Sequence, residues 1–153
     1  MEMNAEQHIP APRETVWAAL NDTEILKAAM PGCEEFEAVG EHAFVAKITA
    51  KVGPVKAKFK FNVSLTDVDP PNGYTINGEG QGGVAGFAKG GASVSLVEEG
   101  DGTLLRYSVK ANVGGKLAQL GARLIDGTAR KMADEFFGNF VEILSGEATS
   151  ADD

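Results

Sequence analysis

The segment that most constrains the fold runs from Val55 to Leu65 and reads VKAKFKFNVSL. Its odd-numbered residues are apolar and its even-numbered residues are polar. This alternation is the period of a β-strand with one buried face. A sheet with a single apolar face must bury that face against another element. The chain therefore needs a second layer that is large enough to cover a sheet.

That layer is predicted near the C-terminal end, where residues 114–144 carry one long helical pattern. A helix of about 28 residues would be about 40 Å long at 1.5 Å per residue. Turn residues separate a series of candidate strands before it, and two short helices are expected, one with Pro12 in its first turn and one capped by Thr23. The candidate strands are 3–9, 33–39, 42–52, 55–67, 73–81, 85–98 and 103–113.

The order of these elements predicts an α+β helix-grip fold. A curved antiparallel sheet of about seven strands would wrap around the long C-terminal helix, with two short helices after the first strand. We expect a single domain over residues 1–145. The tail, residues 146–153, is small, polar and acidic, and is expected to be disordered.

Composition excludes several classes of function. The net charge of -8 argues against nucleic-acid binding, which requires a basic surface. Cys33 is the only cysteine, and His8 and His42 are the only histidines, so no metal site is expected. No nucleophile motif is present, and we predict no catalytic residue and no resident cofactor. The N-terminus has no basic or apolar leader pattern, which makes the cytoplasm the expected location.

The run GEGQGG places Gly78, Gly80 and Gly83 in GxGxxG order. That motif binds a dinucleotide only where it opens a helix, because the helix N-terminus receives the pyrophosphate. The following residues, VAGFAKGGASVSL, have a strand pattern instead. We interpret these glycines as bulges or sharp bends of the sheet.

Basic residues concentrate on one predicted hairpin. If Gly53 and Pro54 form its two-residue turn, five lysines share one face: Lys47, Lys51, Lys56, Lys58 and Lys60. This face could be a solubilising outer surface that also protects a sheet edge. Alternatively, it could dock on anionic lipid headgroups or an acidic partner. The sequence alone leaves both interpretations open.

The assembled features resemble the family of the carbon monoxide dehydrogenase G subunit (CoxG), within the START-related helix-grip (SRPBCC) superfamily. The resemblance covers about residues 3–144, and its segments are VWAALND, MPGCEE, KVGPVKAKFKFNVSL, DPPNGYTINGEGQGGVAGFAKGGASVSL, GTLLRYSVKANVGGKLAQLGARLI and DEFF. It implies a non-catalytic accessory protein of a molybdenum carbon monoxide dehydrogenase or related hydroxylase. Such proteins are thought to connect these enzymes with the membrane and its respiratory quinone pool. Related helix-grip proteins bind lipids, sterols or polyketides between helix and sheet.

The helical pattern is thin in its N-terminal half, where Gly121 and Gly127 lie among alanines. Glycine inside a helix costs about 1 kcal/mol relative to alanine, so these positions need a reason. Either the helix approaches the sheet closely, or it leaves room for an apolar ligand, for which we expect a respiratory quinone or another lipid. Strand parity and helix position predict a cavity lined by Phe59, Phe61, Gly80, Phe87, Leu117, Leu120, Gly121 and Leu124.

Two other functions stay open. The protein could be a scaffold that recruits the enzyme to the membrane peripherally, through the lysine face, and holds no ligand. It could also be a small enzyme of the polyketide-cyclase type. That chemistry needs polar groups inside the cavity, and the candidates are Tyr74, Arg106 and Tyr107.

Overall fold

The computed structural model describes residues 1–152, with side chains described as far as residue 146. Seven strands and three α-helices follow one another with two short 3-10 segments, η1 and η2. Their bounds are β1 Glu2–Ile9, α1 Arg13–Leu20, α2 Thr23–Ala29, β2 Cys33–Gly40, β3 Ala43–Val52, β4 Val55–Asp69, β5 Gly73–Gln81, η1 Gly83–Ala85, β6 Phe87–Glu99, β7 Gly102–Gly114, η2 Gly115–Leu120 and α3 Ala122–Asp152.

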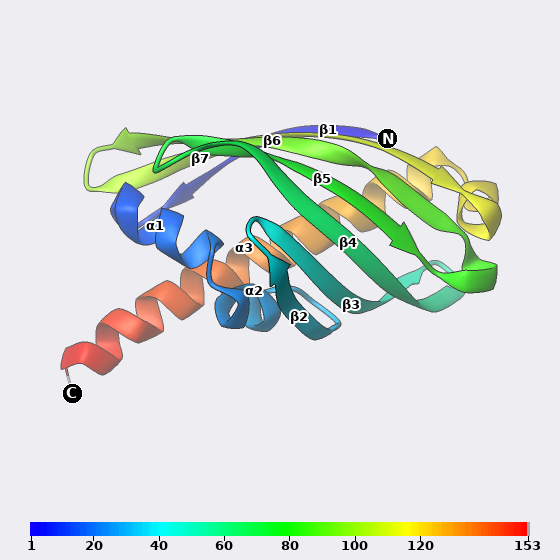
Figure 1. Cartoon of the computed structure of the whole chain (residues 1–153), viewed down its shortest axis with the longest axis horizontal. Coiled ribbons are helices and arrows are strands. Elements are labelled where there is room, and N and C mark those ends of the chain that lie inside the picture. Colours follow the sequence, from blue (N-terminus) through cyan, green and yellow to red (C-terminus); the bar gives the residue numbers. More distant parts are fainter. Residues whose placement is uncertain (153) are drawn as a thin grey trace.

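The strands form one antiparallel sheet in the order β1-β7-β6-β5-β4-β3-β2. The sheet curves over α3, which crosses its concave side along the length of the molecule (Figure 1). Helices α1 and α2 follow the first strand, and α2 packs beside α3, where Asn139 Nδ2 donates to the Ala29 carbonyl at 3.0 Å. The predicted helix-grip fold is confirmed.

Apolar side chains gather in two groups on the inner side of the sheet, one packed against α3 and the other against η2. The larger, which we call the main core, includes Ile9, Val16, Leu105 and Phe140, all at most 1% exposed. The smaller, which we call the end cluster, consists of Val52, Phe59, Ala85 and Leu117 with partly buried neighbours. It lies at the end of the sheet where η1 and η2 meet the β3–β4 turn.

Two local predictions were wrong. The helical pattern of residues 114–144 is not continuous, because η2 ends at Leu120 and Gly121 has a φ of +94°, which no α-helix contains. Helix α3 begins only after this break. The cap of α2 is Asp22 rather than Thr23, since the Asp22 side chain accepts from the backbone N–H groups of Glu24 and Ile25.

The predicted β3–β4 hairpin is confirmed. Val52 pairs with Val55 across the Gly53-Pro54 turn, Lys51 pairs with Lys56, and Lys47 pairs with Lys60. Among the described residues, no helix is long and apolar enough to cross a membrane. The predicted disordered tail falls mostly outside the described side chains and stays a prediction.

Candidate functional site

The candidate site is an apolar cavity of about 370 Å³ between the concave face of the sheet and the middle of α3. All seven strands contribute to its wall, together with α1, α2 and the segment Met132–Phe137 of α3. Every lining residue is aliphatic, aromatic or methionine, and two of them are tyrosines. The site can therefore hold an apolar molecule, and its polar contacts must come from those tyrosines.

Aromatic rings on α3 keep this part of the helix away from the sheet. Phe137 stacks on Tyr107 of β7 with ring centroids 5.4 Å apart, and Phe136 stacks on Phe140 at 5.7 Å. Phe36 and Phe44 line the cavity from β2 and β3 and remain half-buried, although both point toward the interior. Inward-facing residues that keep some exposure indicate an interior that is open and incompletely filled.

Tyr74 on β5 and Tyr107 on β7 supply the polar groups of the cavity. Burial raises the pKa of Tyr74 to about 12. Burial also raises the pKa of Tyr107, as does the Asp134 carboxylate, while Arg130 opposes them. Both hydroxyls are therefore protonated at neutral pH. Among the described residues neither hydroxyl makes a hydrogen bond, so both can donate to a bound ligand.

The third polar candidate, Arg106, lies outside the cavity. Its Nε is 3.5 Å from Glu6 Oε2, and its side chain is 59% exposed. Side chains alternate along β7, and Leu105 and Tyr107 on either side of Arg106 point into the cavity, so Arg106 points outward. Trp17 of α1 packs edge-on against Tyr74, with ring centroids 5.5 Å apart. This tryptophan is therefore placed to report on the cavity.

The cavity residues predicted from the sequence do not line this cavity. Phe59 and Leu117 are buried in the end cluster, and Phe61 and Leu120 pack against it. A Cβ on Gly80 would lie 2.3 Å from the Phe61 ring, so this glycine accommodates an aromatic neighbour. Phe87, Gly121 and Leu124 are exposed at the same end.

The reason for this error is the break at Gly121. It turns η2 back onto the sheet, where its leucines fill the space that a continuous thin helix would leave open. The sequence did contain a signal for the residues that line the observed cavity. The inward parity of β4 continues beyond Phe61 to Val63 and Leu65, and the bulky half of α3 carries Phe136.

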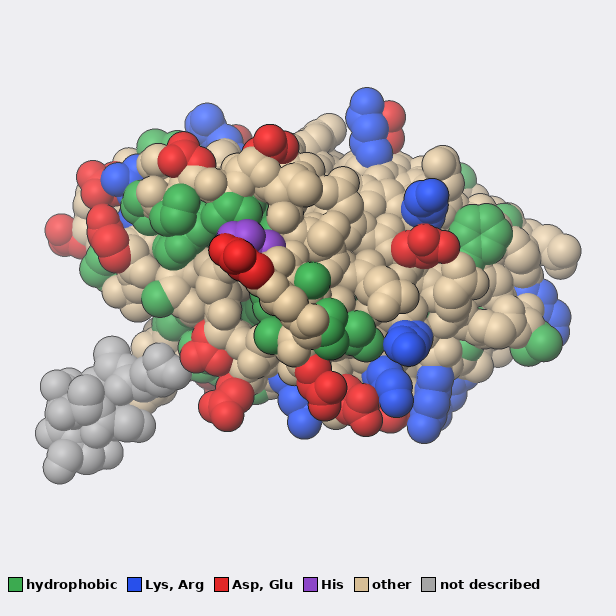
Figure 2. All heavy atoms as spheres, viewed as in Figure 1, with side chains coloured by type: hydrophobic (Ala, Val, Ile, Leu, Met, Phe, Trp, Pro, Cys, Tyr) green, Lys and Arg blue, Asp and Glu red, His purple; other side chains and the backbone are tan. Residues whose placement is uncertain are grey.

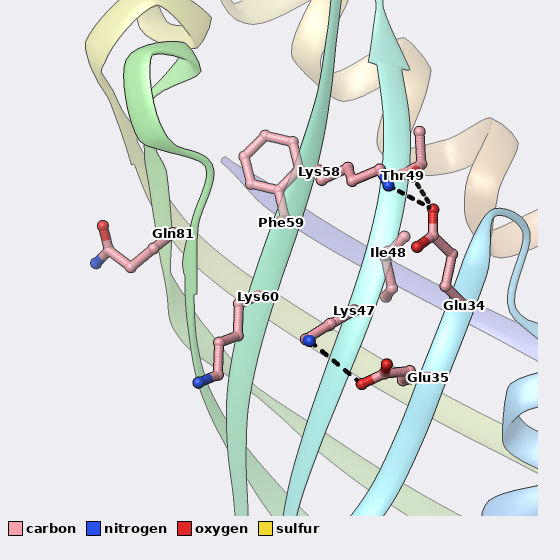
Figure 3. Close-up of a pocket in the computed structure, with 9 residues that line it drawn as sticks. All are labelled: Glu34, Glu35, Lys47, Ile48, Thr49, Lys58, Phe59, Lys60 and Gln81. Atoms are coloured by element: carbon pink, nitrogen blue, oxygen red, sulfur yellow. Dashed lines mark hydrogen bonds and ion pairs between the residues drawn. The ribbon is translucent and has the colours of Figure 1, made fainter.

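The lysine face is confirmed as a surface but is partly neutralised by β2 (Figure 3). Lys47 Nζ lies 3.4 Å from Glu35, and Lys58 Nζ lies 3.5 Å from Glu34. Thr49 Oγ1 donates to Glu34 at 2.8 Å, and this hydrogen bond, with Lys58, lowers the pKa of Glu34. Within the described part of the chain, the other lysines of this face, Lys51, Lys56 and Lys60, form no ion pair.

No cluster of three or more metal-ligating side chains occurs in the part of the chain that the structure describes. Cys33 is partly buried, and its Sγ donates to the Glu35 carbonyl at 3.2 Å. Burial raises the pKa of this thiol, which makes it a weak nucleophile. The cavity is therefore the strongest candidate site.

Comparisons with known proteins agree with this architecture. The model of one family, that of the carbon monoxide dehydrogenase G subunit (CoxG), matches residues 6–145. A solved structure of a conserved protein from Geobacillus kaustophilus is 29% identical, with 95% of this chain and 96% of that chain covered and a TM-score of 0.90. No protein of curated function matches the chain in sequence.

Two more distant structures show the fold alone. A protein from Thermus thermophilus is 19% identical over 95% of this chain and 99% of its own, with a TM-score of 0.71. The structure of Ara h 8.0201 is 17% identical over 95% of this chain and 98% of its own, with a TM-score of 0.63.

Proposed function

Because the chain belongs to the CoxG family of carbon monoxide dehydrogenase, we propose that it is a non-catalytic accessory protein of a molybdenum carbon monoxide dehydrogenase or related hydroxylase. It carries a hydrophobic molecule in the cavity between sheet and helix, and it links the enzyme with the membrane. The ligand class is a respiratory quinone, which has an isoprenoid tail and a ring with carbonyl acceptors.

The apolar cavity is the observation that carries this proposal. Its volume of about 370 Å³ is within the usual range of ligand sites, about 300–1,000 Å³. Burial of a tail contributes about 2.5 kcal/mol for each 100 Å² of apolar surface, so affinity needs no polar motif. The hydroxyls of Tyr74 and Tyr107 can donate to ring carbonyls, since both are protonated.

The same cavity argues against the cyclase-type alternative. Acid and base catalysis needs an ionisable group within hydrogen-bond reach of the substrate. Among the residues that the structure describes, the wall contains no Asp, Glu, His, Lys or Arg, and its ionisable side chains are Tyr74 and Tyr107. Because burial raises the pKa of both tyrosines, they stay protonated at neutral pH and supply no base. Arg106 pairs with Glu6 on the outside of the sheet, so it cannot reach a ligand in the cavity.

The test is ligand extraction combined with a titration. Freshly purified protein is extracted with organic solvent and analysed by mass spectrometry, and a short-chain ubiquinone is titrated while Trp17 fluorescence is recorded. We expect saturable quenching, because Trp17 contacts Tyr74 in the cavity wall. Ala133→Leu fills the cavity and should abolish quenching, whereas Ala122→Leu makes the same change on the exposed start of α3 and should not.

The accessory role is tested separately by binding of the purified molybdenum hydroxylase. If the protein carries no extractable lipid and shows no quenching with ubiquinone, but still binds the enzyme, it is a scaffold without a ligand. Quenching that survives Ala133→Leu would place the quinone outside the cavity and contradict the carrier proposal. Tyr107→Phe removes the hydroxyl that would donate to a quinone carbonyl, and it should weaken quinone binding about fivefold.

A further inference from the structure

An apolar tip projects from the end of the molecule that holds η1 and η2. Val84 in η1 is 92% exposed, Phe87 beside it is 42% exposed, and Leu124 at the start of α3 is 37% exposed. These are three of the five large hydrophobic side chains that are exposed in the described residues. We call them the tip residues. An exposed apolar group at one end of a molecule indicates an interaction surface.

The backbone holds the tip in a defined conformation. Ala85 N donates to the Gly82 carbonyl at 3.1 Å, and Gly82 N donates to the Gly86 carbonyl at 2.8 Å. The φ of Gly86 is +118°, and a Cβ there would lie 2.0 Å from the Gly114 carbonyl oxygen. Glycine is therefore required for this turn, which keeps Val84 pointing into solvent instead of folding it into the end cluster.

The charge around the tip is opposite to that of the whole protein. The three segments that build this end, residues 51–56, 81–89 and 114–124, contain five Lys or Arg residues and no Asp or Glu. The turns at the other end of the sheet, residues 66–73 and 98–102, contain five Asp or Glu residues and no Lys or Arg. Figure 2 shows basic side chains at the right-hand end of the molecule and acidic ones gathered at its left-hand end, while acidic and basic side chains lie side by side along the lower edge.

We propose that this end docks on an anionic phospholipid bilayer, with Val84 and Phe87 inserted among the headgroups and acyl chains. The basic residues around the tip, Lys51, Lys56, Lys89, Lys116 and Arg123, contact the phosphate groups. This inference rests on the proposed membrane link and gives it a surface. It also places the docking site at the tip end of the lysine face, with Lys51 and Lys56, and away from Lys47 and Lys58, which Glu35 and Glu34 already pair.

A bilayer fits the tip better than a protein partner does. A stable protein interface of about 20–30 residues on each side has a buried centre that is rich in apolar and aromatic residues, and the tip offers only three exposed large apolar side chains for such a centre. Peripheral membrane binding needs only a small inserted apolar area together with cationic residues. Each basic residue near an anionic surface strengthens binding about fivefold, so a cluster of five can supply the remaining affinity.

The test is sedimentation of the full chain with vesicles. One set contains phosphatidylcholine alone, and the other contains phosphatidylcholine with about one third phosphatidylglycerol. We expect binding to the anionic set only, with loss at high salt because the Debye length falls to about 3 Å at 1 M. Val84→Asp should weaken binding about tenfold. Val97→Asp is the matched control, since Val97 is 46% exposed near the acidic end.

A second pair of variants separates the tip from the lysine face. Lys116→Gln with Arg123→Gln should weaken binding about 25-fold, which is two factors of about five. Lys47→Gln with Lys58→Gln should change it much less, because both lysines already face carboxylates. If the Lys47 and Lys58 variant lost more vesicle binding than the Lys116 and Arg123 variant, the membrane would dock at Lys47 and Lys58, and the proposal would be overturned.

The remaining outcomes also decide the question. Equal binding to both vesicle sets, or no binding to either, contradicts docking on anionic lipid. Quinone titration of Val84→Asp with Trp17 fluorescence keeps the two proposals apart, since Val84 lies outside the cavity wall. If Val84→Asp loses vesicle binding but binds quinone as the wild type does, the result supports docking through the tip residues. Absent quinone binding with intact, tip-dependent vesicle binding contradicts the carrier proposal alone.

Discussion

The two apolar interiors under the sheet, the cavity beside α3 and the end cluster beside η2, differ in how completely they are filled. In the end cluster, Phe59 is 5% exposed and Leu117 is 6% exposed, and a Cβ on Gly82 would lie 2.3 Å from the Phe59 ring. Around the cavity, Phe36, Phe44 and Phe137 point inward but remain half-buried. The same sheet thus closes at one end and stays open in the middle.

The difference shows that large side chains, and not small ones, keep this interior open. Where α3 carries Phe136 and Phe137, the Phe137 ring stacks on Tyr107 of β7 and Phe136 packs edge-on against Phe137, so aromatic rings separate the helix from the sheet. Where the chain carries small residues, the helix start reaches the hairpin turn, and a Cβ on Gly53 would lie 2.6 Å from Leu124. Ligand space therefore follows from the spacing between backbones more than from the size of individual residues.

The largest expected effect is a difference in cost between aromatic residues of the two interiors. Phe59→Ala should lower the free energy of unfolding by about 3–5 kcal/mol, because it empties a filled site. Phe36→Ala should cost about 1–2 kcal/mol, because this ring is half-buried at the cavity wall. Urea unfolding measures both. Equal costs would mean that the cavity is as tightly packed as the end cluster.

A second prediction concerns the turn that closes the filled end. Gly86→Ala should destabilise the protein by about 3 kcal/mol, from a positive φ combined with a clash against the Gly114 carbonyl. Gly83 also has a positive φ, +60°, but no atom lies within 4 Å of the place where a Cβ would stand. Gly83→Ala should therefore destabilise the protein by only about 1 kcal/mol. Similar urea midpoints for both variants would contradict a close-packed turn.

The fold could be predicted from sequence because its signals are local and repeated. Alternation from Val55 to Leu65 and turn residues such as Gly53 set strand identity and register, and the observed pairing of Lys51 with Lys56 follows from them. The break at Gly121 could not be predicted in the same way. A glycine within a helical pattern is compatible with a continuous helix, and only tertiary packing selects the positive φ.

The candidate site was harder to predict, because a cavity is a property of spacing. The alternation of apolar and polar residues correctly placed Phe59 and Phe61 on the inner face of the sheet. It does not indicate at which point along the strand the helix lies far enough from the sheet to leave a cavity. Tyr74 and Tyr107 were recognised as polar candidates and do line the cavity, whereas Arg106 does not. Their ligand contacts stay predictions.

The buried tyrosine of the open interior gives a pH-dependent prediction. Burial raises the folded pKa of Tyr74 to about 12, above the unfolded value near 10. Its contribution to stability is therefore complete below pH 10 and is lost as the pH rises through 12. Relative to Tyr74→Phe, the wild type should lose about 3 kcal/mol across that range. Parallel urea midpoints for both proteins from pH 9 to 12 would show that water reaches this hydroxyl freely.

The smallest expected effect tests why the helix is thin next to the end cluster. Gly127 lies within α3, is exposed, and has open space where a Cβ would stand. Gly127→Ala should therefore raise the free energy of unfolding by about 0.5–1 kcal/mol, from helix propensity alone. A destabilised variant in urea unfolding would reveal a contact that the helix needs there. A stabilised one would mean that neither close packing nor the ligand cavity requires this glycine, so that open space in this molecule depends on Phe136 and Phe137 rather than on thin stretches of helix.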